Sequence, residues 1–191
     1  MFTYNKRMLF LKLFSAVFLC FMFSSCVTSK NPLCDKKNSV LDSGLIGVWQ
    51  GESEQVIISQ AEGQLLFTEK DTNEKVKQKY TGYTAQIKSD NFLIIQGYEN
   101  TAKDEYVFVH YVLSGNNVLT VYALNTEFFI NAVEKQLIKG EIIKNKDWDK
   151  GVQLTDTTEN MFEFLNKIDK KYYLKNEPGI YKKIVNENVK S

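Results

Sequence analysis

Apolar residues alternate with polar ones through much of residues 45–124, which is the spacing of strands with two different faces. The pattern predicts short strands over residues 45–49, 56–59, 65–69, 83–88, 92–98, 106–113 and 118–124. The last two are joined by Ser114-Gly115-Asn116-Asn117, whose residues tolerate the positive φ angles of a hairpin. Both faces of the 106–113 strand are largely apolar, so we expect it to be central and covered on both sides.

After residue 125 the apolar spacing changes to that of helices. A short helix is predicted to begin at Thr126, which can cap it, and to end near Gly140. A second helix is predicted over 157–169, with Asp156 as its N-cap and Glu159 completing a variant of the capping box.

Residues 141–144, 152–154 and 180–184 are further strand candidates. Short strands separated by turns favour a mainly β domain, either a barrel or a sandwich, with one or two helices. An α+β arrangement is the alternative.

The first residues follow a different pattern. Lys6, Arg7 and Lys12 precede an apolar run over 13–23 that only Ser15 interrupts. A basic segment followed by 7–15 apolar residues is typical of a secretory signal peptide. The run is too short for a membrane-spanning helix, which needs about 20 apolar residues.

The string Phe23-Ser24-Ser25-Cys26, at the end of this run, resembles the lipobox of bacterial lipoproteins. The resemblance implies cleavage before Cys26 and fatty acyl groups, palmitate among them, on this residue, and three chains are enough for stable anchoring. Val27 at the next position favours the outer membrane, with the domain facing the periplasm. The alternative is an ordinary secretory signal that leaves Cys26 as an unmodified thiol.

The expected organisation is therefore a signal peptide over 1–25, a lipidated tether over 26–42 and a single β-rich domain over 43–191. Residues 27–42 are polar, contain Pro32 and show no periodicity, which predicts a flexible connection. Cys34 lies in this segment and is the only cysteine left after Cys26, so an intramolecular disulfide is excluded. We expect an unpaired thiol, and an intermolecular disulfide is the alternative.

Composition excludes several functions. The 24 basic and 23 acidic residues nearly balance and form no basic stripe, so nucleic acid is not an expected partner. His110 is the only histidine, which excludes a zinc site built from histidines and cysteines. Its apolar neighbours predict a packed core residue. Glu52 and Glu54 flank the first turn, and Asp147 and Asp149 form a second acidic pair, but no nucleotide-binding or hydrolase motif accompanies them. We expect no enzyme activity, no catalytic residue, no metal and no cofactor.

Gly47-Val48-Trp49, near the start of the first predicted strand, resembles the Gly-x-Trp signature of the lipocalins. The resemblance implies an eight-stranded barrel that the tryptophan closes at one end, with an interior that holds an apolar ligand. Lipocalins stack an arginine from a late strand on this tryptophan. The mature chain has no arginine, and a lysine such as Lys182 is a candidate substitute through a cation–π contact. The string LTDTTENMFEFL also resembles uncharacterised proteobacterial lipoproteins, which implies no function.

Two functions follow from these expectations. In the first, the domain is a structural or protein-interacting component of the cell envelope, and its barrel is filled by Phe92, Ile94, Phe108 and Val121. In the second, it is a binding module for a small apolar or amphipathic ligand. The candidate residues for its lumen are Gly47, Trp49, Tyr106, Phe108, His110, Tyr111 and Tyr122. A cavity above about 300 Å³ would favour the second function.

Overall fold

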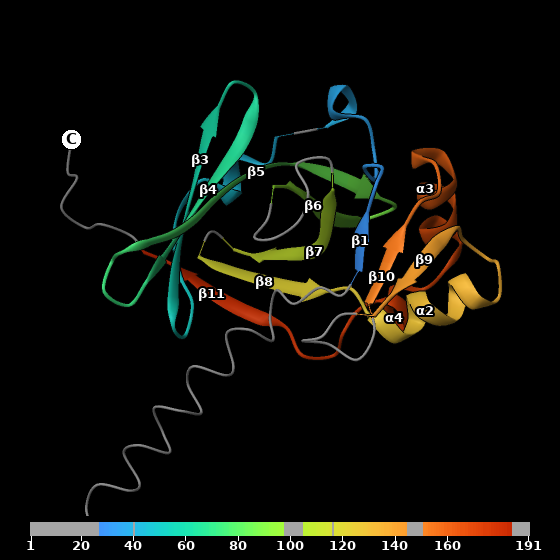
Figure 1. The fold of residues 1–191 in the computed structure, drawn as a ribbon. Helices are drawn as coiled ribbons and strands as arrows, with labels where there is room; N and C mark the ends of the chain where they lie inside the picture. The colour runs from blue at the N-terminus through green and yellow to red at the C-terminus, as the bar shows by residue number, and fades with distance from the viewer. Residues whose placement is uncertain (1–26, 40, 98–104, 116, 145–150, 185–191) are drawn as a thin grey trace, which may run out of the picture.

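The computed structural model describes residues 27–39, 41–97, 105–115, 117–144 and 151–184. Cys26 and the pair Asp147 and Asp149 lie outside these residues. Within them, eight antiparallel strands close into a barrel, and a three-stranded extension and three helices lie to one side of it (Figure 1). The mainly β expectation is confirmed, and of its two forms the barrel is the one observed.

The barrel strands follow the chain, with one exception. They are β2 (Gly47–Gln50), β3 (Glu54–Ala61), β4 (Gln64–Asp71), β5 (Val76–Ile87), β6 (Asp90–Gln96), β7 (Tyr106–Ser114), β8 (Val118–Ala123) and β11 (Gly179–Lys183). Consecutive strands pair from β2 to β8, and β11 pairs with both β8 and β2. The ring is therefore closed by the last strand, which comes after all the helices in the sequence.

Strand β5 begins seven residues earlier than the pattern predicts. Its first part places Lys77 and Lys79 on the outside, where they are exposed, and Gln78 and Tyr80 on the inside. The alternation is present, but few of these side chains are apolar, so it is weak in the sequence.

The expectation of a flexible tether is wrong for the part of residues 27–42 that the structure describes. Strand β1 (Val27–Ser29) pairs in parallel with β10 (Gly151–Leu154) and meets β7 through Ser29 and Tyr106. Strand β9 (Gly140–Ile143) pairs with the other edge of β10. Val27 is 1% exposed and Leu33 is fully buried. Two isolated apolar residues in a polar segment carry no periodicity, so no pattern of the sequence predicts this strand.

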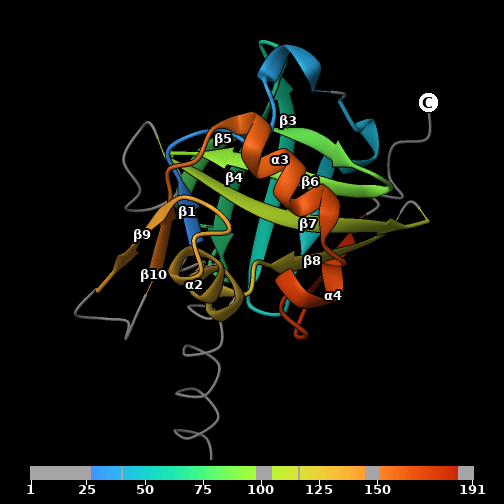
Figure 2. The same cartoon turned by 90° about the vertical axis from the view of Figure 1, so that its right-hand side faces the viewer.

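The remaining elements are short. The 3-10 helices η1 (Lys36–Asn38) and η2 (Ser43–Leu45) lie in the segment that leads into β2. Helices α2 (Thr126–Glu134), α3 (Thr158–Lys167) and α4 (Lys170–Tyr173) lie beside the outer surface of the barrel (Figure 2). None of the helices among the described residues has the length and apolar character needed to cross a membrane.

Both predicted helices form, but their N-caps differ by one residue from those expected, and the first helix ends at Glu134 instead of near Gly140, which begins β9. Asn125, not Thr126, caps α2 by accepting a hydrogen bond from the backbone N–H of Phe128. Thr157 caps α3 in the same way, in place of Asp156. Asp156 is buried, and its carboxylate instead accepts hydrogen bonds from the backbone N–H groups of Lys139 and Thr157.

Two apolar clusters lie on the two sides of the barrel wall. The interior cluster consists of buried residues from all eight barrel strands, together with Leu45: Trp49, Val56, Ile58, Leu65, Phe67, Tyr80, Leu93, Ile95, Val107, Val109, Tyr111, Leu119, Val121 and Tyr181. The outer cluster packs β5, β6 and β7 against β1, β10 and the helices. Strand β7 contributes Val107 and Val109 to the first cluster and Phe108 to the second, which confirms the expectation of a central strand covered on both sides.

Trp49 lies in the barrel near η2 and is fully buried. Its indole N–H donates to the carbonyl of Leu45 at 2.7 Å. The Nζ atom of Lys183 lies 5.2 Å from the Trp49 ring centroid and donates to the carbonyl of Gly44 at 3.1 Å. A lysine therefore does contact the tryptophan, but it is Lys183. Lys182, on the other face of β11, is exposed.

Gly47 makes room for this arrangement. Its φ is +147°, and a Cβ atom there would lie 2.4 Å from Cε of Lys183. The lysine stem thus crosses the space that a side chain at position 47 would occupy. The glycine and the tryptophan of the Gly-x-Trp string act together. Gly47 leaves space for the Lys183 stem, and the Trp49 ring contacts the Lys183 ammonium group.

Lys183→Met removes this cation but keeps most of the apolar stem. We expect the variant to lose about 0.5–2 kcal/mol of unfolding free energy, since the cation–π contact and a hydrogen bond are both lost. Lys182→Met is the matched control, and its exposed side chain predicts a change within about 0.5 kcal/mol. Urea unfolding measures both. Equal losses in the two variants would contradict the role given to Lys183.

Candidate functional site

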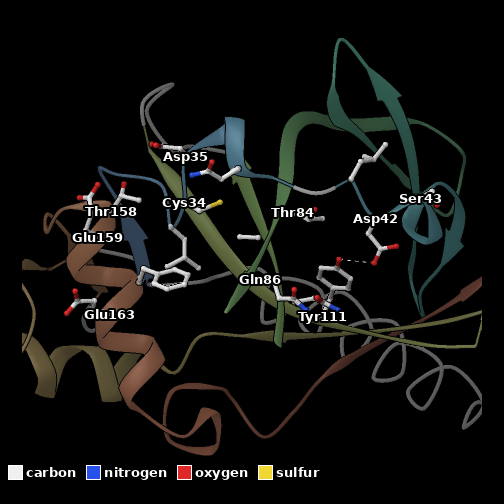
Figure 3. Close-up of a pocket in the computed structure, with 16 residues that line it drawn as sticks. Cys34, Asp35, Asp42, Ser43, Thr84, Gln86, Tyr111, Thr158, Glu159 and Glu163 are labelled. Carbon is white, nitrogen blue, oxygen red and sulfur yellow. Dashed lines mark hydrogen bonds between the residues drawn. The ribbon is translucent and has the colours of Figure 1, made fainter. Parts of the chain in front are cut away.

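A cleft of about 930 Å³ lies beside the barrel. One wall is the segment over residues 33–43, another is β5 with the start of β6, and the third is α3 (Figure 3). These segments are far apart in the sequence, and no single motif marks them. The volume exceeds the 300 Å³ at which small-molecule sites begin.

The cleft draws its lining from both faces of β5. Ala85 belongs to the outer cluster, whereas Thr84 and Gln86 share the inward face with Tyr80. Tyr111, an interior residue, lines the cleft as well. The cleft therefore runs from the η2 end of the barrel interior to the groove under α3.

The apolar part of the lining lies toward α3. Leu33, Ala85 and Phe162 line this part. The segment that carries Leu33 is fixed to the barrel, because the Tyr83 hydroxyl donates to the carbonyl of Cys34 at 2.9 Å. The apolar wall is thus held in place by a hydrogen bond from β5.

The charged groups of the lining are all acidic. They are Asp35, Asp42, Glu159 and Glu163, and no lysine, arginine or histidine is among the described lining residues. Lys37 lies 3.3 Å from Asp35 and Lys167 lies 3.1 Å from Glu163, but both pairs are exposed and offset little of the charge. The described lining of the cleft therefore offers no cation that could hold a carboxylate or a phosphate.

Asp42 lies at the barrel end of the cleft, where the Tyr111 hydroxyl donates to it at 2.9 Å (Figure 3). Burial raises the pKa of Tyr111, and the Asp42 carboxylate raises it further, so the hydroxyl stays protonated. The other carboxylate oxygen of Asp42 accepts a hydrogen bond from the backbone N–H of Gly44 in η2. The carboxylate is therefore oriented from two sides.

Cys34 is a half-buried free thiol in the same lining. Burial raises its pKa, and Asp35 raises it further. A thiol with a raised pKa is mostly protonated at neutral pH and is a weak nucleophile. Cys34 thus has the properties of a lining residue, not of a catalytic one.

The structure separates the residues predicted to line a lumen. Trp49 and Tyr111 lie in the interior cluster, and Gly47 lies beneath Lys183 at the η2 end. The others lie on the outer side of the wall, in or beside the outer cluster: Tyr106, Phe108, His110 and Tyr122. Of the four residues expected to fill the barrel, Phe92, Ile94 and Phe108 are likewise outside, and Val121 is inside. The reason is that both faces of these strands are apolar, so alternation does not show which face is the interior.

His110 is 3% exposed and lies beneath α4. Its Nε2 atom lies 3.5 Å from Oδ1 of Asp90, which also accepts from Lys170 at 2.5 Å. The rings of Phe92 and Tyr122 lie at 5.5 and 5.4 Å. Burial lowers the pKa of His110 more than Asp90 raises it, so the imidazole is neutral at pH 7. This is the packed core setting that its neighbours predict. Among the described residues, no three His, Cys, Asp or Glu side chains are grouped as metal ligands.

The lowered pKa of His110 predicts a pH dependence. Protonation is harder in the folded state, so the stabilising contribution is complete above the unfolded pKa near 6.5 and is lost as the pH falls below it. Between pH 7.5 and 5.5 we expect the wild type to lose up to about 1.4 kcal/mol more than His110→Phe. Urea unfolding at both pH values measures this difference. Parallel losses in the two proteins would contradict it.

Comparison of the chain with protein-family models, curated proteins and solved structures finds no match. The resemblance of Gly47-Val48-Trp49 to the lipocalin signature therefore stays a prediction from the sequence.

Proposed function

We propose that this protein is a membrane-anchored binding module for a small amphipathic ligand. The observation that carries the proposal is the cleft of about 930 Å³, which lies within the range of small-molecule sites, 300–1,000 Å³. Its lining combines an apolar wall with a few oriented polar groups, as such sites do.

The lining also indicates the chemistry of the ligand. The apolar wall around Phe162 fits a hydrocarbon portion, and Asp42 and Glu159 favour a cationic head group over an anionic one. A fatty acid or a phospholipid phosphate would place its charge against acidic residues. An amphipathic amine is the class that fits both parts of the cleft.

The anchor is the second half of this proposal. The lipobox-like string ending at Cys26 and the preceding apolar run support lipidation and an envelope location, with the outer membrane favoured by Val27. Mass spectrometry of the protein purified from membranes tests it. A Cys26 peptide bearing acyl chains is expected, and an unmodified Cys26 would contradict the anchor but leave the cleft unaffected.

Native mass spectrometry of residues 27–191, which contain every described element, tests the binding module directly. An added mass that disappears on denaturation would identify a bound ligand. We further expect n-octylammonium to slow the labelling of Cys34 by a maleimide, because Cys34 lines the cleft, and sodium octanoate to have little effect.

Phe162→Ala removes the largest apolar side chain from the cleft wall. We expect the octylammonium concentration that half-protects Cys34 to rise about 5- to 30-fold in this variant. This is the equivalent of about 1–2 kcal/mol of lost apolar contact. The matched control is Ile180→Ala on β11, where the side chain is exposed and outside this cleft. Equal protection by octanoate, or an equal effect of the two variants, would contradict the site.

The alternative function is a contact with another envelope protein. Exposed apolar residues on the edge strand β9 favour it, since Ile142 is 37% and Ile143 is 41% exposed. If neither a bound ligand nor protection of Cys34 is found, this edge of β9 becomes the surface on which a protein partner is expected.

A further inference from the structure

The barrel end of the cleft carries a row of three polar side chains on neighbouring strands. Gln86 on β5 is directly opposite Asn91 on β6, and Asn91 is directly opposite Tyr111 on β7. Directly opposed residues of antiparallel strands point to the same face of the sheet, with Cβ atoms about 4.5–5.5 Å apart. Tyr111 belongs to the interior cluster, so Gln86 and Asn91 point to the inner face as well. All three residues line the cleft.

The two amides of this row are accessible and have no partner. The side chain of Gln86 is exposed and that of Asn91 is half-buried. Neither amide makes a hydrogen bond to any residue that the structure describes, whereas the Tyr111 hydroxyl donates to Asp42 at 2.9 Å. An amide carbonyl accepts hydrogen bonds, and its NH₂ group donates two. The row therefore offers both donors and acceptors to a molecule in the cleft.

The polar row and the apolar wall lie at different ends of the cleft. Figure 3 shows Gln86, Tyr111 and Asp42 together on the barrel side, whereas Glu159 lies with α3 on the other side. Phe162, the largest apolar residue of the lining, is one turn after Glu159 on the same helix. An amphipathic ligand is therefore expected to place its polar head at the row and its hydrocarbon tail at Phe162.

An ammonium group alone does not match the polar end. It donates hydrogen bonds and accepts none, so it fits the Asp42 carboxylate but offers no acceptor to the N–H groups of Gln86 and Asn91. A ligand that displaces the water around these amides without replacing its hydrogen bonds loses affinity. A hydroxyl group both donates and accepts, so it can pair with either half of an amide.

This inference rests on the proposed function and specifies the ligand further. We propose that the head group of the ligand is an amino alcohol, whose ammonium group binds Asp42 and whose hydroxyl groups bind the amides of Gln86 and Asn91. Tyr111 is the positioning residue, because it lies beside Asn91 in the row and its hydroxyl donates to Asp42. The carboxylate and the two amides are thereby held next to each other.

The test compares 2-aminooctane with 2-aminooctane-1,3-diol, which differ only in two hydroxyl groups. Each is added to residues 27–191, which contain every described element, at constant pH and ionic strength. Labelling of Cys34 by a maleimide reports occupancy of the cleft. Hydroxyl groups that find no partner are costly to desolvate, so apolar contact alone predicts weaker protection by the diol. We expect the diol to half-protect Cys34 at a concentration about 5- to 10-fold lower than the amine does, because its hydroxyl groups are hydrogen-bonded.

Gln86→Met removes one amide of the row but keeps the length of an exposed side chain, so the variant should fold. We expect the half-protecting concentration of the diol to rise about 3- to 10-fold and that of 2-aminooctane to stay unchanged. The matched control is Gln60→Met, because Gln60 is exposed on β3 and outside the cleft lining. Phe162→Ala should weaken protection by both probes alike, since they share the hydrocarbon tail.

The outcomes separate this inference from the proposed function. Protection of Cys34 by 2-aminooctane with no gain from the diol would overturn the amino-alcohol head group and leave the binding module in place. Equal effects of Gln86→Met on the two probes, or an equal effect of Gln60→Met on the diol, would overturn the role of the row in the same way. Protection by neither probe would overturn both proposals.

Discussion

The pairing of β11 with both β8 and β2 is the constraint on which the rest of the structure depends. It turns a meander of seven strands into a closed ring and so removes two exposed edges. The same five-residue strand sends Tyr181 toward Glu54 and Lys183 over Trp49. One short strand thus supplies side chains to both ends of the barrel.

Much of this fold is predictable from the periodicity of the chain. The hairpin of β7 and β8 and helix α3 form close to their predicted bounds, because their apolar side chains repeat at a spacing that one element alone satisfies. The helix caps shift by one residue because Asn125 and Thr157 compete with equally suitable neighbours. Strand β1 cannot be predicted from periodicity, since three residues are too few to show a period.

The candidate sites are less predictable, for two physical reasons. On β7 both faces are apolar, so Phe108 and Tyr111 look alike in the sequence although the wall of the barrel separates them. The cleft joins residues 33–43 to α3, and proximity of this kind is set by tertiary packing alone. The sequence shows Glu54 as a carboxylate, but it does not show the hydrogen bond that this side chain accepts from Tyr181, 127 residues away.

The entry of the chain into the sheet at Val27 has a mechanical consequence. Consecutive Cα atoms are about 3.8 Å apart, so any group attached to Cys26 is one peptide away from a hydrogen-bonded strand. A pull on the chain at Val27 would act on the sheet directly, because this residue is itself paired with Val152 of β10. The load would pass through the parallel pairing of β1 with β10 and the contact of Ser29 with Tyr106.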